Sequence, residues 1–81
     1  MAEMNAGSLP DVVKELRRRE RMTQQELSIK SGVGLRFVRE LEQGKPTVRL
    51  DKVNQLLDLF NYELRAVPKA PQAHPVTGEA G

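Results

Sequence analysis

The chain has 81 residues, of which 38% are hydrophobic, and its 13 lysines and arginines against 11 acidic residues give a formal net charge of +2. A chain of this length forms one small domain with a limited core, so association with a second subunit is a natural source of extra stability. The absence of cysteine excludes disulfides, thiolate metal sites and cysteine nucleophiles. The small positive charge permits nucleic-acid binding without requiring it.

Targeting, catalytic and metal-binding patterns are also missing from the sequence. No apolar run approaches the roughly 20 residues of a membrane helix, and the start Met-Ala-Glu-Met-Asn has neither the basic residues nor the apolar core of a secretory signal. We therefore expect a cytoplasmic protein with no membrane partner. The sequence offers no nucleophile with its base, no phosphate loop and no metal cluster. The only histidine, His74, lies in a proline-rich tail, which argues against a histidine-based active site or a structural metal site. The sequence predicts neither an enzyme nor a cofactor.

The first predicted helix follows residues 1–7, which show no periodicity and are expected to be a flexible lead-in. Ser8 and Asp11 have the spacing of a helix start, and Pro10 is tolerated in the first turn. The apolar stripe of this helix consists of Leu9, Val12, Val13 and Leu16. The basic run 17–19 on the opposite face has two open interpretations, a solvated surface or a contribution to a nucleic-acid-binding field.

Residues 23–45 predict two short helices joined by a tight turn. Thr23 and Glu26 have the spacing of a capping box, so a helix should begin at Gln24 and end before Gly32. The second helix is expected from Leu35 to Gln43, followed by the glycine stop at residue 44. The predicted core residues of this region are Met22, Leu27, Val33, Val38 and Leu41. Ile29 should face outward, either as an incidental exposed residue or as a partner contact.

A further helix is predicted from about Arg49 to Phe60, with Asn61 as a left-handed C-cap. Its apolar stripe consists of Leu50, Val53, Leu56, Leu57 and Phe60, which is wide enough to pack on the other helices and to leave area for a second subunit. Residues 68–81 hold three prolines and few bulky apolar side chains, so a disordered tail is expected.

Residues 62–67 alternate with period two and predict a short strand, whose members are Tyr62, Glu63, Leu64, Arg65, Ala66 and Val67. A single strand on a helical domain needs a partner for its backbone groups, and the same strand of a second subunit would supply one. A twofold axis near Leu64 would set Glu63 of one chain opposite Arg65 of the other. The alternative is an extended tail lying on the last helix.

The order of motifs in residues 23–45 resembles the Xre/Cro-type helix-turn-helix of phage repressors and bacterial regulators. The shared elements are Thr-Gln-x-Glu-Leu, Ser-Gly-Val-Gly and Val-x-x-Leu-Glu-x-Gly-Lys. This resemblance implies an all-α, phage-repressor-like bundle of four to five short helices over residues 8–61, whose second motif helix enters the DNA major groove. Gly34 departs from the family pattern, since a serine or threonine usually caps this helix there; glycine is an acceptable cap without a side-chain oxygen.

Packing of Val38 and Leu41 in the core leaves five positions on the outer surface of the second motif helix: Leu35, Arg36, Arg39, Glu40 and Gln43. The resemblance implies base contacts for the first four of them, and arginine is the best single reader of guanine, so Arg36 and Arg39 are the main candidates. Leu35 and Phe37 could meet thymine methyl groups, although Phe37 has an equal alternative in packing against the following loop. Glu40 either accepts from a cytosine or, as we prefer, orients Arg36 four residues earlier.

Contacts to the DNA backbone are expected around this helix, from Gln24 at the start of the preceding helix and from Gln43, Lys45 and Thr47 at the other end. The resemblance also implies an ion pair between Arg17 and Glu42, which would brace the first helix against the third.

The sequence as a whole predicts a DNA-binding transcriptional repressor that acts as a homodimer on a palindromic operator. The short helix-turn-helix domain followed directly by the predicted strand resembles the HipB-type antitoxins, which implies a HipA-like Ser/Thr kinase toxin as partner and no small-molecule effector. A stand-alone Xre-type repressor has the same DNA chemistry and stays open as an alternative. A protein-interaction adaptor is a further alternative, which the basic residues around the second motif helix disfavour.

Overall fold

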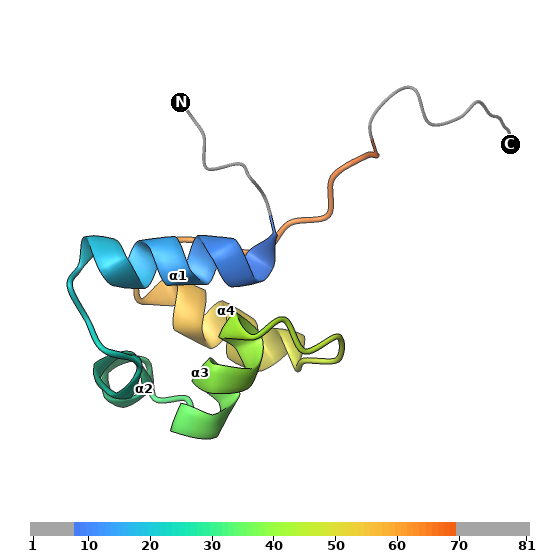
Figure 1. Ribbon diagram of the computed structural model, residues 1–81. Helices are drawn as coiled ribbons and strands as arrows, with labels where there is room; N and C mark the ends of the chain where they lie inside the picture. Colours follow the sequence, from blue (N-terminus) through green and yellow to red (C-terminus); the bar gives the residue numbers. More distant parts are fainter. Residues whose placement is uncertain (1–7, 70–81) are drawn as a thin grey trace, which may run out of the picture.

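The computed structural model describes residues 8–69, and in this range it contains four α-helices and no strand. They are α1 (Leu9–Arg19), α2 (Gln24–Ser31), α3 (Leu35–Glu42) and α4 (Leu50–Asp58). Figure 1 shows α1 along one side of the molecule, with α2 and α3 below it and α4 behind. The all-α prediction is confirmed. The flexible lead-in at 1–7 and most of the predicted tail, 70–81, lie outside the described residues.

The first two helices begin where their capping residues predict. Ser8 is the N-cap of α1, and its hydroxyl accepts from the Asp11 N–H at 3.3 Å. At the start of α2 the Thr23 hydroxyl accepts from the Glu26 N–H at 3.0 Å, while the Glu26 carboxylate accepts from the Thr23 N–H at 2.8 Å. These reciprocal bonds satisfy two backbone donors that the first turn leaves unpaired.

Three helices end in the same backbone closure, in which one residue takes a left-handed conformation and the next N–H bonds back five positions. The left-handed residues are Arg21 (φ 56°), Gly44 (φ 84°) and Asn61 (φ 62°). The bonds run from Met22 to the Arg17 carbonyl, from Lys45 to Glu40 and from Tyr62 to Leu57. The predicted stops at Gly44 and Asn61 are thus confirmed. An arginine in this role was not anticipated, because β-carbon contacts disfavour the conformation.

A single core joins the four helices. Within residues 8–69 the buried hydrophobic residues that form it are Val13, Leu16, Leu27, Val33, Val38, Leu41, Val53, Leu56 and Leu57. All nine were among the predicted core residues. Leu50 is the exception within the predicted stripe of α4, because it is 63% exposed. It is the first residue of α4, one turn before Val53, so the stripe continues beyond the part of the helix that the core covers.

Residues 62–69 form no strand within the described chain. Leu64 is half-buried against the core, and its N–H donates to the Asn54 Oδ1 of α4 at 3.1 Å. The segment passes behind α1 in Figure 1 and emerges near the N-terminal end of that helix. One subunit alone offers no second strand, so a side chain satisfies this backbone donor instead. Pairing across a dimer stays a prediction.

Candidate nucleic-acid interface

A left-handed glycine and two side-chain hydrogen bonds stabilise the turn between α2 and α3 and so fix the angle between these helices. Gly32 adopts a left-handed conformation with φ 84°. The Ser28 hydroxyl donates to the Val33 carbonyl at 2.7 Å, and Gln55 Nε2 of α4 donates to the Ser31 carbonyl at 3.0 Å. A β-carbon at Gly32 would lie 2.9 Å from Gln55 Nε2. The turn therefore favours glycine for its left-handed conformation, and a β-carbon would also displace the Gln55 side chain from its bond to the Ser31 carbonyl.

The N-terminus of α3 lacks a side-chain cap. Gly34 is the N-cap residue, with φ −69° and ψ 153°, and no side chain bonds the first-turn N–H groups. The helix begins at Leu35, as predicted. The extended conformation of Gly34 is one that any residue can adopt, so the N-cap position does not require glycine. A β-carbon at Gly34 would have no heavy atom within 4 Å. The Gly34 position therefore has room for a side chain.

The two faces of α3 separate as the sequence predicts. Val38 and Leu41 are buried in the core, whereas Arg36, Arg39 and Gln43 are exposed. The Arg36 side chain is 90% exposed. Leu35 and Glu40 are half-buried. Phe37 is also half-buried and packs against the core, as does Val48 of the following loop, so packing accounts for part of its surface.

Glu42 joins three helices through a buried network. Its side chain is 3% exposed and accepts from Arg17 of α1 at 2.7 Å (Nε to Oε2) and 2.9 Å (Nη2 to Oε1). Gln24 Nε2, at the start of α2, donates to Oε1 at 3.0 Å, and Arg17 Nη1 donates to the Met22 carbonyl at 2.9 Å. The Arg17–Glu42 ion pair implied by the resemblance is present. Its two parallel bonds fix the orientation of α3 on α1.

Burial by itself raises the pKa of the Glu42 carboxyl, but the hydrogen bonds from Arg17 and Gln24, together with the charges of Arg17 and Lys14, outweigh it, so the pKa lies below its ordinary value. The hydrogen bond to Glu42 raises the pKa of Arg17 against the opposing effect of burial. Both residues are therefore charged at neutral pH. The bond from Gln24 to Glu42 was not predicted. The Gln24 side chain points toward Glu42, although it was expected to contact a DNA phosphate.

Glu40 accepts from two cations on the outer side of α3. Arg36 Nε lies 3.2 Å from Oε2, and Lys45 Nζ lies 3.2 Å from Oε1. The hydrogen bond from Lys45, with a second from Arg36, lowers the pKa of Glu40 despite its partial burial. The predicted Arg36–Glu40 contact is present. The Lys45 contact was missed, although the glycine before Lys45 indicates a chain that folds back over the last helical turn.

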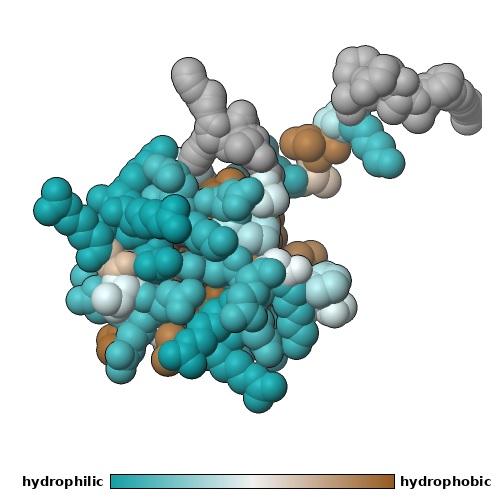
Figure 2. All heavy atoms as spheres, viewed as in Figure 1, coloured by the Kyte–Doolittle hydropathy of each residue, from teal (hydrophilic) through white to brown (hydrophobic). Residues whose placement is uncertain are grey.

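The remaining candidates for contacts to the DNA backbone lie at the C-terminal end of α3. Gln43 is the C-cap residue, and Lys45 and Thr47 follow in the loop to α4; all three are exposed. Together with the outer positions of α3 they form one polar surface, and Figure 2 shows hydrophilic side chains over most of the face seen in that view. This arrangement of a fixed helix pair with a polar outer face is the one that presents a helix to the major groove.

Comparison with known proteins decides the family. A family model described as "Helix-turn-helix" matches residues 13–67. The chain belongs to the Xre-type helix-turn-helix regulators. It is 46% identical over 53 residues to "Uncharacterized HTH-type transcriptional regulator y4mF" of Sinorhizobium fredii (strain NBRC 101917 / NGR234), a match that covers 65% of this chain and 70% of that protein.

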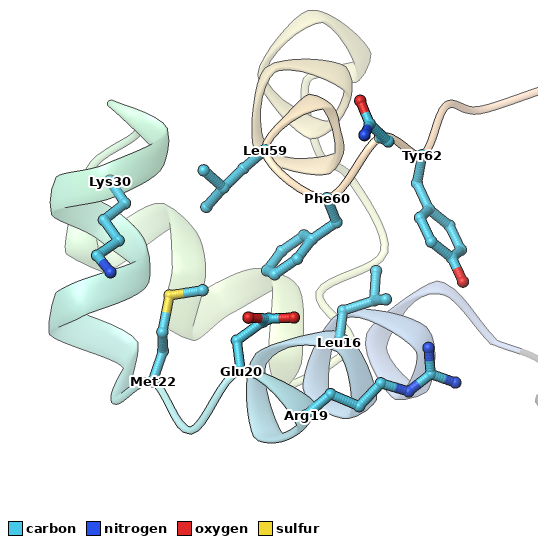
Figure 3. Close-up of a pocket in the computed structure, with 9 residues that line it drawn as sticks. Leu16, Arg19, Glu20, Met22, Lys30, Leu59, Phe60 and Tyr62 are labelled. Atoms are coloured by element: carbon cyan, nitrogen blue, oxygen red, sulfur yellow. The ribbon is translucent and has the colours of Figure 1, made fainter.

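A second surface of this helix-turn-helix domain lies where the ends of α1 and α4 meet α2. It holds a hollow of about 430 Å³, whose lining includes Leu16, Met22, Leu59, Phe60 and Tyr62. Figure 3 shows Arg19, Glu20 and Lys30 among the residues around it. Among its lining residues, Tyr62 was predicted to lie in the dimer interface. Within residues 8–69 there is no group of three potential metal ligands and no helix long and apolar enough to cross a membrane.

Proposed function

We propose that this protein is a sequence-specific DNA-binding transcriptional repressor whose α3 reads bases in the major groove. The observation that carries the proposal is the outer face of α3. Arg36 is 90% exposed on it, Arg39 is exposed one turn further on, and Glu42 locks the opposite side of the helix to α1 and α2. Family membership supports double-stranded DNA as the ligand. A rigid helix with exposed arginines can form paired bonds to guanine O6 and N7.

The base-reading surface comprises Leu35, Arg36, Phe37, Arg39 and Glu40, with Arg36 and Arg39 as its main readers and Glu40 as the residue that orients Arg36. Contacts to phosphates come from Gln43, Lys45 and Thr47 at the end of α3, and from the N-terminus of α2 at Gln24. To contact a phosphate, the Gln24 side chain has to give up its bond to Glu42. Otherwise the backbone N–H groups in the first turn of α2 make the phosphate contact. Phosphate contacts set the register and the salt dependence of binding.

Two substitutions separate base reading from backbone contact. Replacement of Arg36 by alanine should cost about 1–3 kcal/mol at the preferred site and relax base choice at one position. Replacement of Lys45 by alanine should weaken binding to all sequences alike and lower the salt slope by about 1. Fluorescence anisotropy with the preferred site and a random duplex, over a salt series, measures both effects. Equal losses on both duplexes for Arg36→Ala would mean that Arg36 is not a base reader.

We further propose that the repressor is a homodimer joined by residues 62–67 and that it binds a palindrome. Leu64 is anchored to α4 through Asn54, and this holds the segment along the surface of the domain. Tyr62 and Val67 are exposed hydrophobic residues on the same segment. Glu63 and Arg65 pair within the chain at 2.7 Å, and the same two side chains can exchange partners across a twofold axis. Half-sites would lie about one helical turn apart, or a multiple of it.

Leu64→Pro removes the backbone donor at the centre of this segment and should leave a monomer at low micromolar concentration. Asn54→Ala is the matched control, because it removes the same hydrogen bond without placing a proline in the segment. Light scattering gives the oligomeric state of each variant. A proline variant that stays dimeric would exclude this segment as the interface.

The finer proposal is that the dimer represses its own operon as the antitoxin of a HipA-like Ser/Thr kinase. Its support is the resemblance to HipB-type antitoxins, together with apolar area outside the base-reading surface, at Ile29 (73% exposed) and at the hollow beside Tyr62. A stand-alone dimeric repressor would use the same α3, so the residues alone do not separate these two functions.

A tagged pull-down from the native cell, with the eluate tested on the DNA upstream of the gene, separates these two functions. Recovery of a kinase-sized protein in a complex that binds this DNA in a salt-sensitive way supports the antitoxin. A dimer that binds the DNA alone supports a stand-alone repressor and contradicts the kinase partner. DNA binding with a flat salt dependence would favour a protein-interaction adaptor over both.

A further inference from the structure

Glu40 is an acidic side chain on the face of α3 that is proposed to approach DNA, a position where an unpaired carboxylate would be repelled by phosphates. Its two oxygens accept from different cations, Oε1 from Lys45 and Oε2 from Arg36. One of these cations belongs to the proposed base-reading surface, and the other to the proposed phosphate contacts. A single carboxylate therefore connects the two kinds of contact.

The backbone brings these three residues together. Arg36 and Glu40 are one helical turn apart on α3, so their side chains are neighbours. Lys45 lies beyond the helix, but its N–H donates to the Glu40 carbonyl at 3.1 Å because Gly44 turns the chain back with φ 84°. Its side chain consequently returns over the last turn of α3 and reaches Glu40. The arrangement is fixed by the fold and does not depend on a long-range contact.

The bond from Arg36 to Glu40 uses Nε, so the terminal nitrogens Nη1 and Nη2 take no part in it. These are the two donors that a guanine would use in a paired contact. At a site that offers this guanine, Arg36 can bind the base and retain Glu40 at the same time. At other sequences Arg36 has no base acceptor, so its orientation by Glu40 brings no base contact there, and the repulsion between the Glu40 carboxylate and the phosphates is not offset.

We propose that Glu40 determines specificity by weakening the binding of this protein to random DNA more than to its preferred site. The proposal rests on DNA binding through α3. With Glu40 present, the group formed by Arg36, Glu40 and Lys45 carries a net charge of +1; without the carboxylate it would carry +2. Charges arranged against wrong partners create discrimination even where they add no affinity for the right one.

Glu40→Gln tests this, since it keeps the shape of the side chain and removes its charge. Random-duplex affinity should rise about three- to tenfold near 0.1 M salt, and the slope of log K against log salt should steepen by about 0.9. Affinity for the preferred site should change less, so the ratio of specific to random binding falls. Glu20→Gln is the matched control, because Glu20 is exposed, lies at the end of α1 and gives the same change in net charge.

A second background separates the charge of Glu40 from its bond to Lys45. In a Lys45→Ala background, Glu40→Gln should still steepen the salt slope, because removal of the carboxylate takes the charge of Arg36 and Glu40 together from zero to +1. An unchanged slope and an unchanged binding ratio for Glu40→Gln alone would overturn the inference. An altered base preference at one position with an unchanged slope would also overturn it and would make Glu40 a reader of cytosine. Wild-type protein that binds no duplex would instead refute the proposed function.

Discussion

Glu42→Gln is expected to destabilise the domain by about 3 kcal/mol. Removal of one partner from a buried ion pair costs about 3–5 kcal/mol, because the other charge stays buried without compensation. Arg17 would keep its bond to the Met22 carbonyl and is 16% exposed, so the lower end of this range applies. The replacement also turns an acceptor into a donor beside Arg17 or Gln24. For a domain of this size the corresponding fall in melting temperature is on the order of 10–20 °C.

Urea unfolding followed by circular dichroism at neutral pH measures this loss. The double variant Arg17→Met, Glu42→Leu removes both charges and should recover to within about 1 kcal/mol of the wild type, since apolar residues of similar size often replace a buried pair at little cost. A loss below about 1 kcal/mol for Glu42→Gln would refute the reasoning, because the network would then contribute no more than an exposed ion pair.

Three further predictions concern pH and backbone conformation. The pKa of the Glu42 carboxyl is depressed in the folded state. The contribution of its charge to folding stability should therefore be complete above the unfolded-state pKa of about 4.3 and be lost as pH falls through the folded-state pKa. In urea titrations, the stability difference between wild type and Glu42→Gln should be smaller at pH 3 than at pH 7. Gly34→Ser should stabilise by about 0.5–1 kcal/mol, chiefly because serine loses less backbone freedom on folding than glycine, with a few tenths of a kcal/mol from the hydroxyl cap, whereas Gly32→Ala should destabilise by more than about 1 kcal/mol; the same sign for both in urea unfolding would contradict this. Arg21→Gly should raise the melting temperature by a few degrees, since glycine removes about 1–2 kcal/mol of left-handed strain against a smaller entropic cost, and a lower melting temperature would show that the strain is smaller than that cost.

Local signals predicted most of the fold. Capping residues such as Ser8 and Thr23 act within one turn of the chain, so their spacing is visible in the sequence and the helices begin where expected. Helical periodicity identified the core in the same way. Leu50 belongs to the predicted stripe of α4 yet is 63% exposed, because periodicity assigns a residue to a face of its helix but does not say where the neighbouring helices end.

The candidate interface was predictable in its outline and less so in its contacts. Which residues of α3 face outward follows from the buried positions of Val38 and Leu41. The bonds of Gln24 to Glu42 and of Lys45 to Glu40 join residues whose distance depends on turns and on packing between helices, and no pattern of residue types gives that distance. The segment 62–67 shows a related limit, because an alternating pattern indicates a strand without supplying its partner.

The turn at Gly44 has a consequence for screens that collect binding-defective variants. This glycine sets the left-handed conformation that returns Lys45 to Glu40, and its own position touches no neighbour closely, since an added β-carbon would be 3.9 Å from Pro10. A β-branched residue at 44 would be strained in this conformation, which Arg21 and Asn61 show that some other side chains accept, and relief of that strain would displace Lys45 and Thr47 together. A screen would then recover such variants as binding-defective, although residue 44 itself contacts no DNA and only positions its neighbours.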